Sequence, residues 1–295
     1  MLDDYPPLPE RITSYCALGD SFSEGLNDPA PGDDPEQLDR FRGWADRLAE
    51  HLTQSPIGSP RLRYANLAIR GRLLAAIVDE QLPRALELKP DLVSLIGGGN
   101  DCIRPKADVD ALSSLLEEAV ATLRKAGIRV LLGTGFDTKH MPVFKAVRGR
   151  IGIYNANIWS IAQQHGADVL NLWAIRELQG ATHWSQDRLH LTSSGHALVA
   201  DEALAVLEGR PLPSHGHPIP PRPPRPVRQA VAEESRWVRE HLAPWVGRRI
   251  RGVSSGDFRQ PKLPQLSFVD PAGAGSPAGD GDQDAAGSTG QTQTD

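Results

Sequence analysis

The segment Tyr15-Cys16-Ala17-Leu18-Gly19-Asp20-Ser21-Phe22-Ser23 joins a short apolar run to a glycine, an acid and a serine. The apolar run predicts a buried strand, and Gly19 permits the tight turn that must follow it. A strand, a turn and then a helix would place Ser21 at the carboxyl edge of a sheet, where open α/β folds bind ligands. This segment therefore predicts an α/β fold with Ser21 at its ligand-binding edge.

Strand-like and helix-like patterns alternate along the chain, which predicts a parallel sheet with helices on both faces, a three-layer α/β/α sandwich. The expected strands cover residues 15–18, 63–67, 92–96, 129–133 and 168–172. The expected helices cover residues 39–52, 71–88, 108–126, 151–165 and 193–207. Gly127 and Gly166 follow two of these helices and are typical of left-handed carboxyl caps.

The 295 residues suit one α/β domain with extensions better than two full domains. We assign this domain to residues 1–210. Residues 211–270 begin with a Pro- and Arg-rich strap that favours extended polyproline structure. A short amphipathic helix is expected at 228–249, docked on the domain or, as the alternative, binding a partner protein. Residues 271–295 are rich in Gly, Ala, Ser, Asp, Gln and Thr and predict a disordered tail.

The composition indicates where the protein is located and which classes of partner it binds. The amino terminus has acids and prolines where a secretory signal needs a basic start, and no apolar run is long enough to span a membrane. Cys16 and Cys102, the only cysteines, give no disulfide framework and are expected to be buried packing residues. We therefore predict a cytoplasmic protein without integral membrane association. The net charge of −5 argues against nucleic acid as a principal partner.

The residues Ser21, Asp187 and His190 are the types that nucleophilic catalysis requires. A serine hydroxyl is a poor nucleophile near neutral pH, so it needs an imidazole to take its proton and a third group to orient that imidazole. Asp187 and His190 supply a carboxylate and an imidazole three residues apart. We expect folding to bring both to Ser21.

Four short segments, in the same order along the chain, resemble those of the GDSL, or SGNH, hydrolase family. They are Gly19-Asp20-Ser21, Asn66-Leu67-Ala68-Ile69-Arg70-Gly71, Gly97-Gly98-Gly99-Asn100-Asp101 and Asp187-Arg188-Leu189-His190. Phe22 stands where the family's name motif has Leu, and Leu191 where many members have Pro. The resemblance implies a flavodoxin-like five-stranded sheet of order 2-1-3-4-5 and hydrolysis of carboxylic esters without metal or organic cofactor. It also implies that the Ser21 N–H, the Gly71 N–H and the Asn100 amide form the oxyanion hole.

Several alternatives remain open. The same site would suit an acyltransferase, or a deacetylase of a carbohydrate or small metabolite, and the same fold would suit a non-catalytic binding protein. His183, Asp187 and His190 are a weaker candidate for zinc. Asp20 and Asp101 are expected to brace turns rather than to act as a paired-carboxylate catalyst. The loop at 134–150 either faces the substrate or is a solvated connector; Trp44 is expected to pack in the core, and Trp184 either packs or lines the substrate surface.

Overall fold

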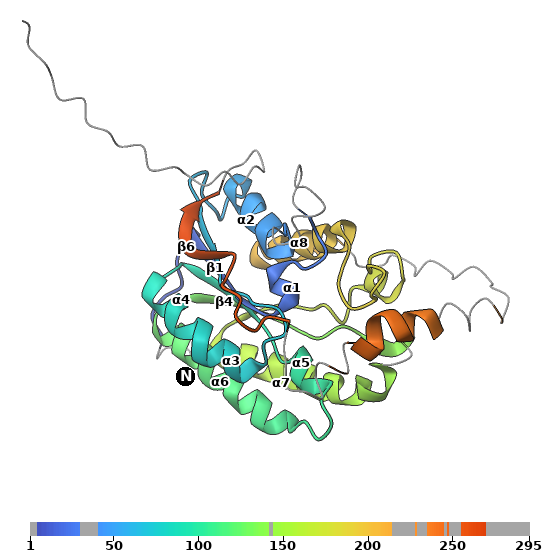
Figure 1. The fold of residues 1–295 in the computed structure, drawn as a ribbon. Coiled ribbons are helices and arrows are strands. Elements are labelled where there is room, and N and C mark those ends of the chain that lie inside the picture. Colours follow the sequence, from blue (N-terminus) through green and yellow to red (C-terminus); the bar gives the residue numbers. More distant parts are fainter. Residues whose placement is uncertain are drawn as a thin grey trace, which may run out of the picture.

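The computed structural model describes residues 5–29, 41–141, 144–213, 228, 235–244, 247 and 255–269. Its sheet has the strand order β5-β4-β3-β1-β2-β6. The parallel strands are β1 (Ser14–Gly19), β2 (Arg63–Asn66), β3 (Leu92–Ile96), β4 (Arg129–Gly133) and β5 (Asp168–Leu170). The predicted parallel order 2-1-3-4-5 is thus confirmed, and Figure 1 shows helices on both sides of the sheet.

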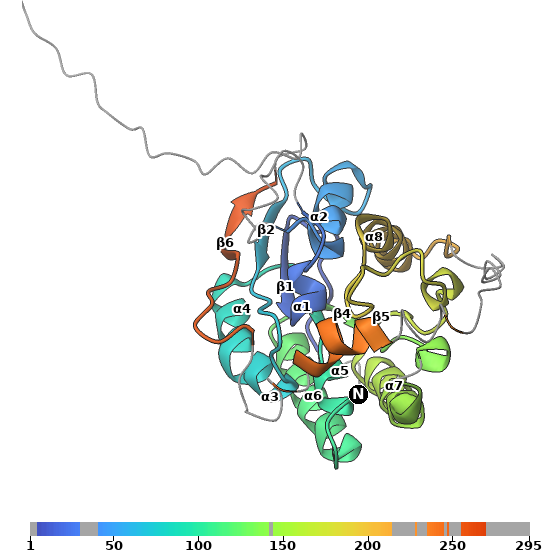
Figure 2. The same cartoon turned by 45° about the vertical axis from the view of Figure 1, so that its right-hand side comes forward.

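A sixth strand corrects the predicted strand count of five. β6 (Leu263–Phe268) pairs antiparallel with β2 and forms one edge of the sheet, within the segment predicted as strap and helix (Figure 2). The sequence signal is weak because most side chains of β6 are exposed and Pro264 interrupts the run. Proline removes a backbone donor, so within sheets it is confined to positions such as an edge strand.

The helices follow the predicted alternation, with shifted ends. They are α1 (Ser21–Glu24), α2 (Trp44–Gln54), α3 (Leu74–Ala76), α4 (Leu82–Leu88), α5 (Gly99–Cys102), α6 (Val109–Lys125), α7 (Arg148–His165) and α8 (Ser193–Leu207). The helix predicted at 71–88 begins at Leu74 and is interrupted by the π-helical turn η2 (Ile77–Gln81). The helix predicted at 39–52 begins at Trp44 within the described part of the chain, and the one predicted at 151–165 begins earlier, at Arg148.

Shorter turns complete the connections. They are η3 (Thr138–His140), η4 (Phe144–Val147), η5 (Arg176–Gln179) and η6 (Val238–Leu242). The described residues 235–244 are helical, as predicted for 228–249. The other parts of that prediction, and the predicted tail at 271–295, fall outside the described residues.

The core lies on the two faces of the sheet because side chains alternate along each strand. In β1, Cys16 and Leu18 pack on one face against α4, α6 and α7, whereas Tyr15 and Ala17 pack on the other against α2 and α8. Trp44 at the start of α2 is fully buried, as predicted. Because β1 to β5 are parallel, their carboxyl ends lie at the same edge of the sheet, where Ser21 follows β1.

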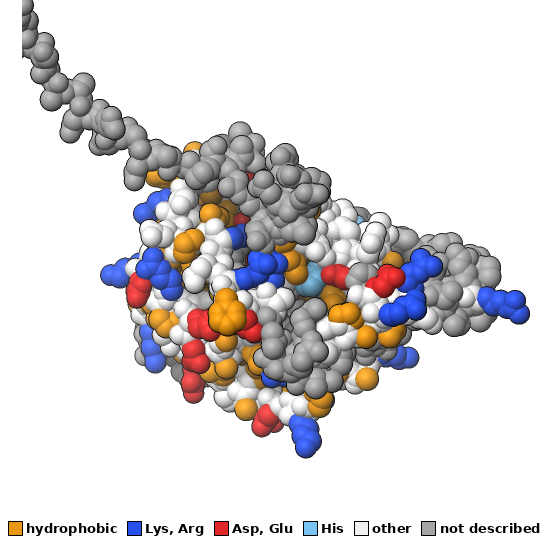
Figure 3. Space-filling view, in the orientation of Figure 1, with side chains coloured by type: hydrophobic (Ala, Val, Ile, Leu, Met, Phe, Trp, Pro, Cys, Tyr) orange, Lys and Arg blue, Asp and Glu red, His pale blue; other side chains and the backbone are white. Residues whose placement is uncertain are grey.

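Two surface observations complete the description. None of the described helices is both long and apolar enough to cross a membrane. On the face shown in Figure 3, acidic and basic side chains of the described residues are interspersed.

Candidate active site

Ser21 and His190 lie within hydrogen-bonding distance although 169 residues separate them. Ser21 begins α1 directly after β1, and His190 lies in the turn that precedes α8. The Ser21 Oγ and the His190 Nε2 are 3.1 Å apart. An imidazole in this position can accept the hydroxyl proton.

Asp187 lies on the opposite side of the imidazole. Its Oδ2 is 2.7 Å from the His190 Nδ1, and its Oδ1 accepts hydrogen bonds from the Ser185 hydroxyl and from the N–H groups of Leu189 and His190. Burial disfavours the charged carboxylate, but the hydrogen bonds from His190, Ser185 and Leu189 outweigh it and hold the Asp187 pKa well below its usual range. Asp187 is therefore an ionised acceptor that can orient His190.

The turn before Ser21 requires glycine at position 19. Gly19 has a φ of +151°, and a Cβ there would lie 2.5 Å from the Ile96 carbonyl oxygen. Asp20 then caps α1 because its Oδ1 accepts from the Phe22 N–H at 3.1 Å. The expected bracing role of Asp20 is confirmed, and Asp101 braces similarly by accepting from the Leu74 N–H.

The predicted oxyanion donors have different environments. The Ser21 N–H has no intrahelical partner because Ser21 is the first residue of α1. Gly71 lies in the turn after β2 with a φ of +77°. Asn100 lies in the first turn of α5 and lines the pocket. Its Nδ2 lies 2.8 Å from the Asp20 Oδ2 and 3.1 Å from the Arg72 carbonyl oxygen. The Asn100 amide is thus near Ser21 but donates to protein acceptors.

Two residues that the sequence analysis missed support this arrangement. The Asn27 Nδ2 donates to the Asp187 Oδ2 at 2.9 Å and to the Ser185 Oγ at 3.0 Å. Glu24, the last residue of α1, accepts from the Arg70 N–H at 2.6 Å and forms a buried ion pair with the Arg70 guanidinium. Asn27 therefore braces Asp187, and Glu24 connects α1 to the residue before Gly71.

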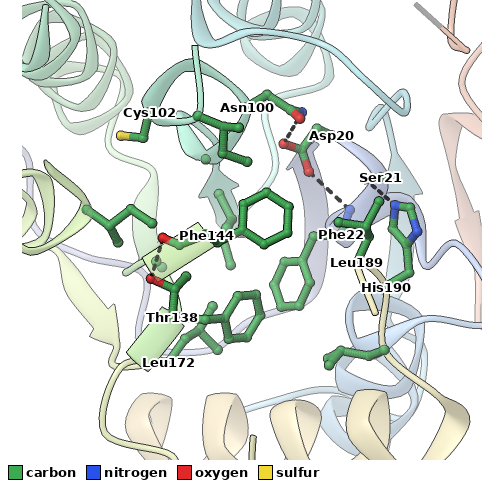
Figure 4. A pocket seen from close by; sticks show the side chains of 18 of the residues that line it. Asp20, Ser21, Phe22, Asn100, Cys102, Thr138, Phe144, Leu172, Leu189 and His190 are labelled. Carbon is green, nitrogen blue, oxygen red and sulfur yellow. Dashed lines mark hydrogen bonds between the residues drawn. The ribbon is translucent and has the colours of Figure 1, made fainter. Parts of the chain in front are cut away.

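A pocket opens beside Ser21 and His190, with a volume of about 180 Å³. Figure 4 shows Ser21 and His190 on one side of it, with Thr138 and Phe144 on the opposite side. The rings of Phe22, Phe136 and Trp184 form a continuous aromatic wall, with centroids 5.3 Å apart for the first pair and 5.1 Å for the second. Trp184 therefore lines the pocket.

The loop at 134–150 faces this pocket. Its lining residues are Thr134, Gly135, Phe136, Thr138, Met141 and Phe144. Two hydroxyls among the lining residues are engaged within the protein: the Thr138 hydroxyl donates to the Phe144 carbonyl oxygen, and the Tyr154 hydroxyl to that of Gly97. The substrate-facing interpretation of the loop is the one that the geometry supports, and the surface it offers is apolar.

The remaining candidates are two cysteines, of which Cys102 lines the pocket, and the possible zinc ligands. Cys16 and Cys102 are buried, and burial raises their thiol pKa values to about 12 and about 11, so both are packing residues, as expected. The His183 Nδ1 lies 3.1 Å from the Ser194 Oγ. Among the described residues, no group of three His, Cys, Asp or Glu side chains could hold a metal ion.

The family model for the GDSL-like Lipase/Acylhydrolase family matches residues 17–198, which include every predicted site residue. The chain belongs to this family. A comparison with curated protein sequences gave no match. Membership of the GDSL-like family agrees with the parallel sheet and with the segments quoted from the sequence.

Solved structures share the fold of this GDSL-like protein. LAE5, an α/β hydrolase enzyme from the metagenome of Lake Arreo, Spain, is 22% identical with a TM-score of 0.56, covering 68% of this chain and 97% of its own. Axe2, an acetylxylan esterase from Geobacillus stearothermophilus, is 18% identical with a TM-score of 0.52, covering 68% and 94%. TesA is 22% identical with a TM-score of 0.51, covering 66% and 98%. The GDSL-like chain thus has the fold of these solved structures, with residues beyond the part that they cover.

Proposed function

We propose that the protein hydrolyses carboxylic esters with Ser21 as nucleophile, His190 as general base and acid, and Asp187 as the acid that orients His190. The observation that carries this proposal is the continuous hydrogen-bonded series at the pocket. The Ser21 Oγ is 3.1 Å from the His190 Nε2, and the His190 Nδ1 is 2.7 Å from the Asp187 Oδ2. Membership of an acylhydrolase family supports the same chemistry.

The reaction proceeds in two halves. His190 takes the Ser21 proton as the Ser21 oxygen attacks the ester carbonyl, and the resulting imidazolium then protonates the departing alcohol. This leaves an acyl group on Ser21. Water, activated by His190, attacks the acyl-enzyme, and His190 returns the proton to Ser21 as the carboxylic acid leaves.

Negative charge on the carbonyl oxygen needs fixed donors during both halves. We assign this role to the N–H groups of Ser21 and Gly71 and to the Asn100 amide. In the free protein the Asn100 amide donates to Asp20 and to the Arg72 carbonyl oxygen. It must exchange one of these acceptors for the oxyanion, because the amide has two N–H donors.

The apolar pocket favours an ester with an apolar acyl group. Its aromatic and aliphatic walls would remove such a group from water, whereas the hydroxyls of a sugar would find few free partners there. The volume of about 180 Å³ is close to that of a cavity that holds benzene, roughly 150 Å³. We therefore propose acyl groups of about six carbons as the preferred substrates.

The test combines a covalent probe with turnover. A fluorophosphonate should label the parent protein at Ser21, and 4-nitrophenyl hexanoate should be hydrolysed; Ser21→Ala should lose both. Ser160→Ala, an exposed serine on α7, is the matched control and should retain both. A folded parent that neither reacts with the probe nor hydrolyses esters would support the non-catalytic binding protein instead.

A further inference from the structure

The segment beyond the family region reaches the catalytic turn through Trp237. The family model ends at residue 198, but the Trp237 Nε1 donates to the Asp187 carbonyl oxygen at 2.9 Å. The Arg188 guanidinium lies 5.0 Å from the centroid of the Trp237 ring. Trp237 is 7% exposed, and Figures 1 and 2 draw the short helix that carries it in orange.

The turn that Trp237 contacts has an unfavourable backbone conformation. Arg188 has a φ of +53°, a left-handed region that residues with side chains seldom adopt. The turn is closed by hydrogen bonds from the Ser185 N–H to the His190 carbonyl oxygen and from the Arg188 N–H to the Ser185 carbonyl oxygen, both 2.9 Å. A strained conformation persists only where surrounding contacts fix it. Trp237 supplies such contacts to two adjacent residues of the turn.

We propose that Trp237 is a positioning residue that holds the Asp187–His190 turn in the geometry that catalysis needs. This inference rests on the proposed role of Asp187. The contacts of Trp237 are with the carbonyl oxygen of Asp187 and the side chain of Arg188, so we assign its effect to these two residues. Its consequence is that residues outside the family region form part of the support of the active site.

A second contact of the same segment reaches the nucleophile helix. The Lys262 Nζ donates to the Glu24 carbonyl oxygen at 2.7 Å, to the Phe41 carbonyl oxygen at 2.8 Å and to the Asp46 Oδ2 at 2.6 Å. Glu24 ends α1, which begins with Ser21. The carboxyl-terminal segment thus contacts both the turn that carries the acid and the helix that carries the nucleophile.

The test replaces the indole N–H while keeping an aromatic ring beside Arg188. Trp237→Phe removes the donor, and 3-benzothienylalanine at position 237 removes it while keeping the bicyclic shape. Trp159→Phe, an exposed tryptophan on α7, is the control. The first readout is the low-field proton NMR signal of the His190 Nδ1–H, which reports the hydrogen bond to Asp187 whether or not the protein turns over an ester. The second is kcat and KM for 4-nitrophenyl hexanoate.

Both changes at position 237 should move the His190 signal upfield and speed its exchange with water. They should lower kcat about five- to tenfold, as expected for loss of one neutral hydrogen bond, and leave KM within about twofold. The control should change neither. An unchanged signal and kcat together with a lower unfolding temperature would overturn the inference, as would absence of the signal from the folded parent. A signal that responds in a protein without Ser21-dependent turnover would retain the positioning role and overturn the proposed function.

Discussion

The Asn100 Nδ2 lies 2.8 Å from the Asp20 Oδ2, so the first turn of α5 is joined to the residue immediately before Ser21. Asp20 also caps α1. Asn100 is therefore held near Ser21 even without substrate. This placement lets the amide change acceptors without a large movement of the backbone.

Asn100→Ala tests the oxyanion role. Removing one oxyanion donor typically lowers kcat by about a hundred- to a thousandfold, and we expect that loss with KM nearly unchanged. Steady-state kinetics with 4-nitrophenyl hexanoate measures both constants. Asn157→Ala is the control. The Asn157 amide donates a hydrogen bond to the Ser113 hydroxyl, and neither residue is among those that line the pocket. A rise in KM with normal kcat would show that Asn100 serves substrate binding instead.

Phe144→Ala tests the size limit of the pocket. Phe144 lines the wall opposite Ser21, so its removal should lengthen the space for the acyl group (Figure 4). We expect the optimum of kcat/KM to move from 4-nitrophenyl hexanoate toward the decanoate ester. Phe258→Ala, at a fully exposed phenylalanine, should leave the optimum in place. If the substitution instead changes how kcat/KM depends on the length of the alcohol in a series of alkyl acetates, the pocket holds the alcohol rather than the acyl group.

The buried His196 should make the free energy of unfolding depend on pH. Burial lowers the His196 pKa to about 3, and its Nδ1 accepts from the Trp44 N–H at 3.1 Å. Between its ordinary pKa of about 6.5 and the folded value, the unfolded chain binds a proton that the folded state rejects. The free energy of unfolding should therefore fall as pH drops through this window, by about 2 kcal/mol at pH 5. Urea unfolding of His196→Gln should lack this contribution; parallel pH curves for the two proteins would contradict it.

Lys262→Met tests the second contact of the carboxyl-terminal segment. The substitution leaves the Asp46 carboxylate buried without its cation, and burial already raises the Asp46 pKa. Breaking a buried pair on one side costs roughly 3 kcal/mol in the free energy of unfolding. Adding Asp46→Asn should recover part of that loss, and Lys125→Met at an exposed site should cost little. Urea titrations of the three variants and the parent measure this; equal losses at Lys262 and Lys125 would show that the pair adds no stability.

The sequence predicted the parallel sheet well because buried strands are continuous apolar runs. The bounds of β3 and β4 match the prediction at both ends. Helix starts were less accurate, since the turn at Gly71 delays the first helical residue to Leu74. β6 was missed because an exposed edge strand with a proline has neither the apolar run nor the alternation of a buried strand.

At the site, residue type and order were enough to select Ser21, Asp187 and His190, which folding brings together. Asn27 and Trp237 could not be found in this way. Each donates a long-range hydrogen bond to Asp187, and the sequence alone does not indicate which asparagine or tryptophan makes such a contact. The cytoplasmic location and the absence of nucleic-acid partners stay predictions.

The antiparallel pairing of β6 with β2 has a consequence for the behaviour of shortened chains. Without β6, the backbone N–H and C=O groups along one side of β2 would face solvent as a template for another chain. β6 itself is a poorer template, because Pro264 lacks an N–H and most of its side chains are exposed. A protein cut before Leu263 should therefore self-associate through its uncovered sheet edge, as a rise in its apparent mass on size-exclusion chromatography would reveal.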